Sequence, residues 1–122
     1  MVVFAGFRDD LERILPCLDL LIHPALMEGL GVSLLQAAAA GVPVVGTRAG
    51  GIPEAMTDGV TGLLIRPGDP EAIAEAAVRI LSNPGLAEKM GLEGKKLAAE
   101  RFSIEAMARG NLEVYRDIMG MD

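Results

Sequence analysis

The sequence is poor in the residue types from which several common kinds of protein site are built. Among its 122 residues there are no Trp, one Cys, one His and one Tyr. With Cys17 as the only cysteine, the chain can form neither an internal disulfide nor a zinc site of several cysteines. The apolar sequence around it, LPCLDLLI, predicts a buried structural thiol and not a catalytic nucleophile, which would need a partner base.

Positive charge is also scarce. The 11 Lys and Arg residues are scattered along the chain against 17 Asp and Glu residues, and aromatic residues make up only 3% of the sequence. Proteins that bind nucleic acid usually carry a basic stripe or a platform of aromatic side chains, so we expect no nucleic-acid partner. The net charge of −6 is assigned mainly to solvated helix surfaces.

No long hydrophobic run is present, although the residues are 51% hydrophobic and the mean hydropathy is +0.37. A membrane-spanning helix needs about 18 or more consecutive apolar residues, so we expect no transmembrane segment. The opening MVVFAGFRDD has neither the basic n-region nor the long apolar h-region of a secretory signal, and we predict a cytoplasmic protein. The apolar residues then belong to a core, a subunit interface or a surface that faced another domain.

Short apolar runs alternate with helical patterns along the chain. We expect a single domain, residues 1–122, with strands at residues 2–4, 20–22, 44–46 and 63–65. Continuously apolar strands that alternate with helices indicate a parallel sheet covered on both faces. The predicted fold is therefore α/β: a truncated Rossmann-like three-layer sandwich with about four parallel strands and flanking helices.

Local signals predict where the helices begin. Asp9 or Asp10 is the expected N-cap of a first short helix, and Asp69 followed by Pro70 marks the start of a longer one. Further helices are expected at residues 32–40, 52–56, 86–100 and from 103 onward.

The stretch EGLGVSLLQAAAAGVPVV, residues 28–45, is the best candidate for a ligand site. In open parallel sheets ligands bind beyond the C-terminal ends of the strands, and this stretch follows the second predicted strand. Its two glycines precede a helix, where free backbone N–H groups can bind an anion such as a phosphate. Without other information, a tight structural turn explains the glycines equally well. The amides in question are those of Leu30, Gly31, Val32 and Ser33.

Four polar side chains in or near this stretch have two interpretations each. Ser33 and Gln36 share one face of an otherwise apolar helix, so they mark either a narrow solvent-facing strip or the wall of a ligand cleft. Glu28 is either a solvated loop residue or a ligand contact, and His23 is more often a strand-end residue than a catalytic one. The sequence shows no paired carboxylates, no Ser-His-Asp set and no cluster of metal ligands, so no metal site is predicted.

The run PALMEGLGVSLLQAAAAGVPVVGTRAGGIPEAMTDGVTGLLIRPGDPEAIAEAA resembles the second half of the C-terminal domain of GT-B fold glycosyltransferases. More narrowly, it is similar to the retaining enzymes of group 1, family 4. Those enzymes share an E-G-x-G turn, a second glutamate, an A-x-G-x-P-V-V segment, a G-G-x-x-E motif and a D-G-x-x-G-x-L segment. The matching residues include Pro24, Glu28, Gly29, Gly31, Ala37, Gly41, Pro43, Gly50, Gly51, Glu54, Asp58, Gly59, Gly62, Pro67 and Asp69.

The resemblance implies a role for each part of the turn and helix. Glu28 would contact hydroxyls of the donor sugar and is the one candidate for catalysis. The second glutamate, which holds the nucleotide ribose, is replaced here by Gln36. A neutral amide forms weaker hydrogen bonds than a carboxylate, so we expect weakened donor binding. The donor would be a UDP- or GDP-linked sugar, with no other cofactor. The diphosphate would lie against Gly29, Leu30, Gly31 and Val32.

The resemblance also implies what the chain does not supply. Residues 1–122 correspond to part of a nucleotide-sugar-binding domain, without the N-terminal acceptor domain or two strand–helix units of the donor domain. We therefore predict a glycosyltransferase-like protein that transfers little or no sugar by itself. One alternative is a non-catalytic binding or assembly module, a homodimer or larger homo-oligomer formed through the open sheet edge or apolar helix faces. A second alternative is a fragment similar to a nucleotide-sugar 2-epimerase.

Overall fold

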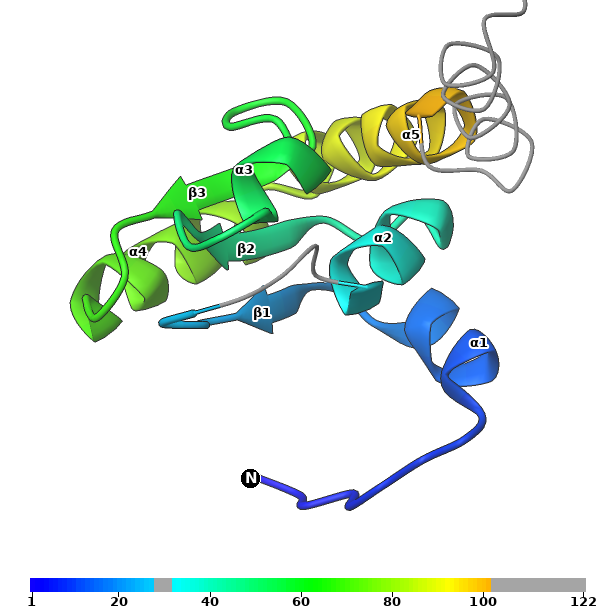
Figure 1. Ribbon diagram of the computed structural model, residues 1–122, viewed down its shortest axis with the longest axis horizontal. Coiled ribbons are helices and arrows are strands. Elements are labelled where there is room, and N and C mark those ends of the chain that lie inside the picture. Colours follow the sequence, from blue (N-terminus) through cyan, green and yellow to red (C-terminus); the bar gives the residue numbers. More distant parts are fainter. Residues whose placement is uncertain (28–31, 102–122) are drawn as a thin grey trace, which may run out of the picture.

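The computed structural model describes residues 1–27 and 32–101. These residues form a small sheet with helices around it (Figure 1). In chain order the elements are α1 (Leu11–Ile14), the 3₁₀ turn η1 (Leu15–Cys17), β1 (Leu21–His23), α2 (Val32–Ala39), β2 (Val44–Thr47), α3 (Ile52–Ala55), β3 (Gly62–Ile65), α4 (Pro70–Leu81) and α5 (Pro84–Arg101).

The three strands are parallel and lie in the order β1-β2-β3. The register pairs Leu21 with Val44 and Val44 with Gly62, so the three C-terminal strand ends lie at one edge of the sheet. Parallel pairing with helical connections is the α/β arrangement that the sequence predicts. The observed strands lie within one or two residues of three of the four predicted ones.

The first predicted strand, residues 2–4, does not form. These residues are outside any strand, and the side chains of Val2, Val3 and Phe4 are 80%, 75% and 95% exposed. A strand needs a neighbour to satisfy its backbone groups. If β1, β2 and β3 are the last three strands of the doubly wound order 3-2-1-4-5-6, residues 2–4 correspond to strand 3. In that order strand 3 pairs with strand 2 and does not pair with strand 4. The described residues provide no such neighbouring strand. The apolar composition of residues 2–4 is not sufficient to form a strand without one.

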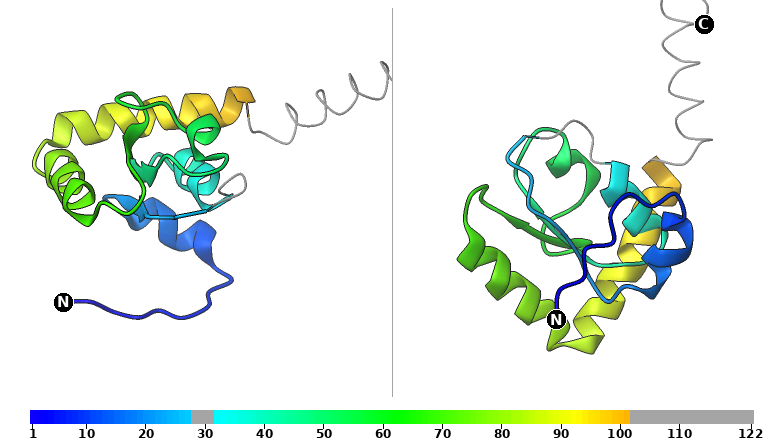
Figure 2. Two further views of the ribbon diagram at one scale, coloured as in Figure 1. Left: turned by 60° about the vertical axis from the view of Figure 1, so that its left-hand side comes forward. Right: turned by 90° about the horizontal axis from the view of Figure 1, so that it is seen from below.

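The sheet separates two hydrophobic clusters, because neighbouring residues of each strand point to opposite faces. Val44 and Leu64 belong to the cluster under α2 and α3, whereas Val45 and Leu63 belong to the cluster under α4 and α5. Figure 2 shows α4 and α2 on opposite sides of the strands, with α5 extending along both. The predicted three layers are therefore present.

Helix α5 approaches α2 closely through glycine. A Cβ atom added to Gly91 would overlap the carbonyl oxygen of Gly41, which follows α2, and one added to Gly94 would lie 3.5 Å from the Cα atom of Ala38. Gly91 and Gly94 are both buried. In this helix the glycines permit backbone contact, and this contact holds α5 against the C-terminal half of α2.

The two predicted N-caps have different outcomes. Asp69 caps α4 as expected, since its Oδ1 accepts a 3.0 Å hydrogen bond from the backbone N–H of Ala72. Asp10 occupies the N-cap position of α1 but its side chain makes no capping bond. The carboxylate is instead bound by Arg8, whose Nε and Nη2 donate at 2.9 and 2.6 Å.

The prediction of a buried thiol is wrong. Cys17 is exposed, and its Sγ lies 3.5 Å from the carbonyl oxygen of Arg13. Leu15 is buried and Leu18 half-buried on the core side of this segment, so Cys17 is directed away from the core. The apolar character of LPCLDLLI reflects only one face of the turn.

Two further sequence predictions concern membranes and the C-terminus. In the part of the chain that the structure describes, every helix is too short or too polar to cross a bilayer. The helix expected from Ser103 onward lies outside the described residues.

Candidate functional site

The candidate site lies where β1 and β2 end. Helix α2 begins at Val32, where the sequence predicts it. Residues 28–31, which include Glu28, Gly29, Leu30 and Gly31, lie outside the described residues, and their assignment to donor binding stays a prediction. The structure describes the residues on both sides of them.

On the strand side, a buried hydroxyl fixes the loop that leads to Glu28. Thr47, the last residue of β2, is 1% exposed, and its Oγ1 donates a 2.6 Å hydrogen bond to the carbonyl oxygen of Ala25. The bond joins the end of β2 to the segment that follows β1. Sequence reasoning missed Thr47, although a lone hydroxyl at the end of the apolar run PVVGT was an available signal.

On the helix side, Ser33 makes the corresponding contact. Its Oγ lies 3.5 Å from Nδ1 of His23, the last residue of β1, and both side chains are half-buried. The first turn of α2 therefore contacts the end of β1. The two contacts, Thr47 with Ala25 and Ser33 with His23, lie on either side of residues 28–31. The sequence placed His23 and Ser33 near the site, and the structure brings them together.

Gln36 lies on α2 with its side chain exposed. It lines a cavity of about 340 Å³ between α2 and the segment formed by α1 and η1. The sequence left open whether Ser33 and Gln36 face solvent or a cleft. Ser33 contacts a strand end, while Gln36 lies at the wall of a cavity that is open to solvent. The cavity is lined by Glu12, Leu15, Pro16, Gln36, Ala39 and Ala40.

An ion pair precedes this cavity along the chain. The guanidinium of Arg8 holds the pKa of the Asp10 carboxyl below its usual value, because it donates two hydrogen bonds to the ionised form. The same contact raises the pKa of Arg8. Both groups are therefore charged and paired with each other. The carboxylate that lines the cavity is that of Glu12, in α1.

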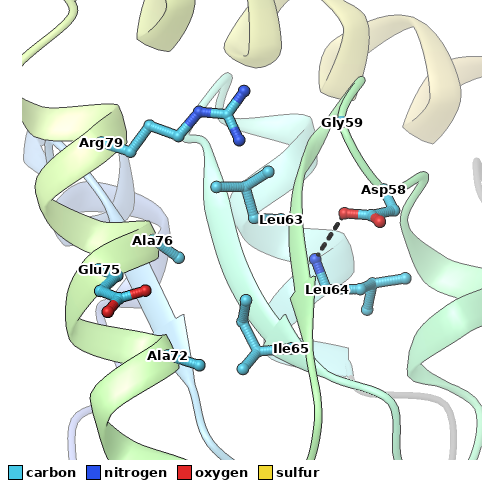
Figure 3. Close-up of a pocket in the computed structure, with 9 residues that line it drawn as sticks. All are labelled: Asp58, Gly59, Leu63, Leu64, Ile65, Ala72, Glu75, Ala76 and Arg79. Atoms are coloured by element: carbon cyan, nitrogen blue, oxygen red, sulfur yellow. Dashed lines mark hydrogen bonds between the residues drawn. The ribbon is translucent and has the colours of Figure 1, made fainter.

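A second cavity, of about 430 Å³, lies between β3 and α4 (Figure 3). At its margin, Oδ1 of Asp58 accepts a 3.0 Å hydrogen bond from the backbone N–H of Leu64, and Oδ2 accepts one of 3.1 Å from Nη2 of Arg48. The backbone N–H of Gly59 donates to the carbonyl oxygen of Gly62 at 2.8 Å. The loop thus forms hydrogen bonds with backbone groups of the edge strand β3, the N–H of Leu64 and the carbonyl oxygen of Gly62. We therefore assign Asp58 a structural role.

No metal centre is formed by the residues described. Within residues 1–27 and 32–101, no three His, Cys, Asp or Glu side chains come together as ligands of a metal ion.

Comparison with known families identifies relatives over nearly the whole chain. The profile of a family described as "Glycosyl transferases group 1" matches residues 1–83. N-acetyl-alpha-D-glucosaminyl L-malate synthase of Bacillus anthracis is 35% identical over 121 residues, which are 99% of this chain and 32% of that protein. Alpha-maltose-1-phosphate synthase of Mycolicibacterium smegmatis is 35% identical over 114 residues, covering 88% of this chain and 30% of that enzyme.

Solved structures agree with this assignment. Anabaena HepE in complex with UDP superposes with a TM-score of 0.88 and 26% identity over 93% of this chain and 32% of its own. Sucrose-phosphate synthase from Thermosynechococcus elongatus gives a TM-score of 0.82 and 30% identity over 88% of this chain and 27% of its own.

The chain thus spans about a third of the length of the curated relatives it matches, for example 32% of the Bacillus anthracis enzyme. The C-terminal domain of LpcC from Francisella tularensis, a group 1 protein, matches 84% of this chain with a TM-score of 0.75. The parallel sheet, the flanking helices and these matches lead to one conclusion: the chain belongs to the group 1 glycosyltransferases and has part of their Rossmann-like GT-B fold.

Proposed function

We propose that this chain is the donor-binding part of a glycosyltransferase and binds a nucleotide sugar at the start of α2. The observation that carries the proposal is the pair of contacts around residues 28–31, Thr47 with Ala25 and Ser33 with His23. They place Ala25 and Ser33, the described residues on either side of this segment in the sequence, at the C-terminal ends of two parallel strands, which is where ligands bind in such sheets. The solved complexes of HepE with UDP and UDP-glucose support the same ligand class.

Within this proposal the residues divide by the part of the donor they contact. Glu28 holds hydroxyls of the donor sugar and is the candidate for catalysis. The amides of Gly29, Leu30, Gly31 and Val32 approach the diphosphate, since backbone N–H groups before a helix bind anions. Gln36 contacts the ribose from the cavity wall that it forms. The donor is linked to UDP or GDP, and we propose no further cofactor.

We expect binding without measurable transfer from the chain by itself. The chain spans about a third of the length of its curated relatives. We therefore expect the acceptor-binding site and part of the donor-binding site to be formed by other sequence. The matching family is described as group 1 glycosyl transferases, which favours this function over the 2-epimerase-like alternative. The predicted cytoplasmic location is kept as part of the proposal.

The binding proposal is tested by calorimetric titration with UDP-glucose, UDP, GDP and glucose. We expect saturable binding of UDP-glucose and UDP but none of glucose. Because Glu28 is assigned to the sugar, Glu28→Gln weakens UDP-glucose binding and leaves UDP binding unchanged. Glu88→Gln is the matched control, since Glu88 is an exposed glutamate on α5. The proposal fails if neither UDP nor GDP binds to the unaltered chain.

An assembly function is favoured by one specific observation. Met1, Val2, Val3, Phe4 and Phe7 are between 75% and 115% exposed, and β1 is an edge strand. We propose that the chain forms a homodimer that covers these residues. Light scattering is expected to give twice the monomer mass for the unaltered chain. The double variant Phe4→Ser/Phe7→Ser is expected to give the monomer mass. A monomer at all concentrations would refute the dimer.

A further inference from the structure

We propose that Glu12 is a nucleoside-binding residue, whose carboxylate accepts hydrogen bonds from the ribose hydroxyls of the donor in the cavity that it shares with Gln36. This inference rests on the proposed function, because it assigns one more contact to the same donor. It concerns a residue of α1 that neither the sequence motifs nor the proposed donor contacts include.

The cavity lies between two facing walls. One wall consists of Gln36, Ala39 and Ala40, which lie three and four residues apart and so share one face of α2. The facing wall is the segment formed by α1 and η1, which contributes Glu12, Leu15 and Pro16. Each wall thus presents one polar side chain beside apolar ones. The volume of about 340 Å³ lies within the roughly 300–1,000 Å³ of small-molecule pockets.

The side chains of both walls match the chemistry of a ribose. A ribose presents apolar ring carbons and two adjacent hydroxyls, each of which needs a hydrogen-bond acceptor. Gln36 supplies one neutral acceptor oxygen, whereas the ionised Glu12 supplies two oxygens that accept stronger, charge-assisted bonds. Ala39, Ala40 and Leu15 supply apolar surface for the ring carbons.

Glu12 is available for such a contact. Among residues 1–27 and 32–101, no ion pair involves Glu12, while the neighbouring Asp10 is engaged by Arg8. The side chain of Glu12 is exposed at the cavity. An acceptor at this position would compensate for the missing carboxylate at Gln36.

The test compares Glu12→Gln with the matched control Glu88→Gln, using UDP and 2′,3′-dideoxy-UDP as probes in calorimetry. We expect Glu12→Gln to weaken UDP binding about three- to tenfold, as the loss of a charge-assisted bond at an exposed site would do. The dideoxy nucleotide lacks both hydroxyls, so its affinity is expected to stay unchanged. Glu88→Gln is expected to alter neither affinity.

A double-mutant cycle with Gln36→Glu completes the design. If the two positions serve the same ribose, Gln36→Glu strengthens UDP binding and reduces the effect of Glu12→Gln. Unaltered UDP binding in Glu12→Gln, or an equal loss for UDP and the dideoxy nucleotide, would overturn the assignment of Glu12 while leaving the proposed function intact. If the unaltered chain binds neither UDP nor GDP, the proposed function fails and this assignment fails with it.

Discussion

The hydroxyl of Thr47 donates a 2.6 Å hydrogen bond to the backbone carbonyl oxygen of Ala25. Thr47 is the last residue of β2 and is almost completely buried, and Ala25 lies in the segment that follows the neighbouring strand β1. A side chain of β2 therefore determines the path of the loop that leads to the proposed sugar-binding Glu28.

Thr47→Val removes this bond while keeping the shape of the side chain. We expect the free energy of unfolding to fall by about 1–3 kcal/mol, because the carbonyl group of Ala25 loses its partner. We also expect weaker binding of UDP-glucose, because the loop is no longer held. Urea denaturation and calorimetric titration measure the two effects. Thr47→Ser retains the hydroxyl, so it should bind UDP-glucose like the unaltered chain. If Thr47→Ser reduces binding and Thr47→Val does not, Thr47 acts through packing and not through its hydroxyl.

The contact between α5 and α2 gives a second prediction. Gly91→Ala should lower the free energy of unfolding by about 3 kcal/mol, because the added methyl group overlaps the carbonyl oxygen of Gly41. Gly85→Ala is the control on the same helix, where the added atom lies 3.7 Å from Asn83 Oδ1. It should be neutral or stabilising by about 0.5 kcal/mol, since Ala favours helix over Gly. Equal denaturation midpoints for both variants would contradict the close approach of the two helices.

The loop at Asp58 gives a third prediction, which separates a backbone hydrogen bond from a surface ion pair. Asp58→Ala leaves the buried backbone N–H of Leu64 without its acceptor. We expect the free energy of unfolding to fall by about 1–2 kcal/mol. Arg48→Ala removes only the ion pair, whose side chains are 53% and 45% exposed, and should change stability by less than about 0.5 kcal/mol. Chemical denaturation of both variants provides the comparison. A larger effect for Arg48→Ala would show that the ion pair, and not the bond to the strand, stabilises this edge.

Much of the fold follows from local sequence signals. Helix α4 begins where Asp69 and Pro70 predict it, because a cap and a proline at N1 act over a few residues. Strands β2 and β3 are predicted because both of their faces are covered and they read as continuous apolar runs. Residues 2–4 have the same local character but no neighbouring strand. Whether they form a strand depends on contacts that composition does not reveal.

The candidate site was only partly predictable for a related reason. The start of α2 and the position of Gln36 follow from the motif and its helical spacing. The roles of Thr47 and Glu12 depend on which distant segments face each other, and no local pattern specifies this. Cys17 shows the same limit in the opposite direction: its apolar neighbours in sequence predict a buried thiol, but the thiol is exposed.

We propose that a nucleotide sugar binds at the start of α2. The most direct measurement is a titration of the isotope-labelled chain with UDP-glucose, followed by the backbone amide signals in NMR spectra. Binding at this site predicts saturable shifts at residues 29–36 and at Thr47. In Glu28→Gln these shifts are expected to need a higher concentration of UDP-glucose, while the titration with UDP stays unchanged. Saturation without shifts at residues 29–36, or shifts confined to the cavity between β3 and α4, would contradict it.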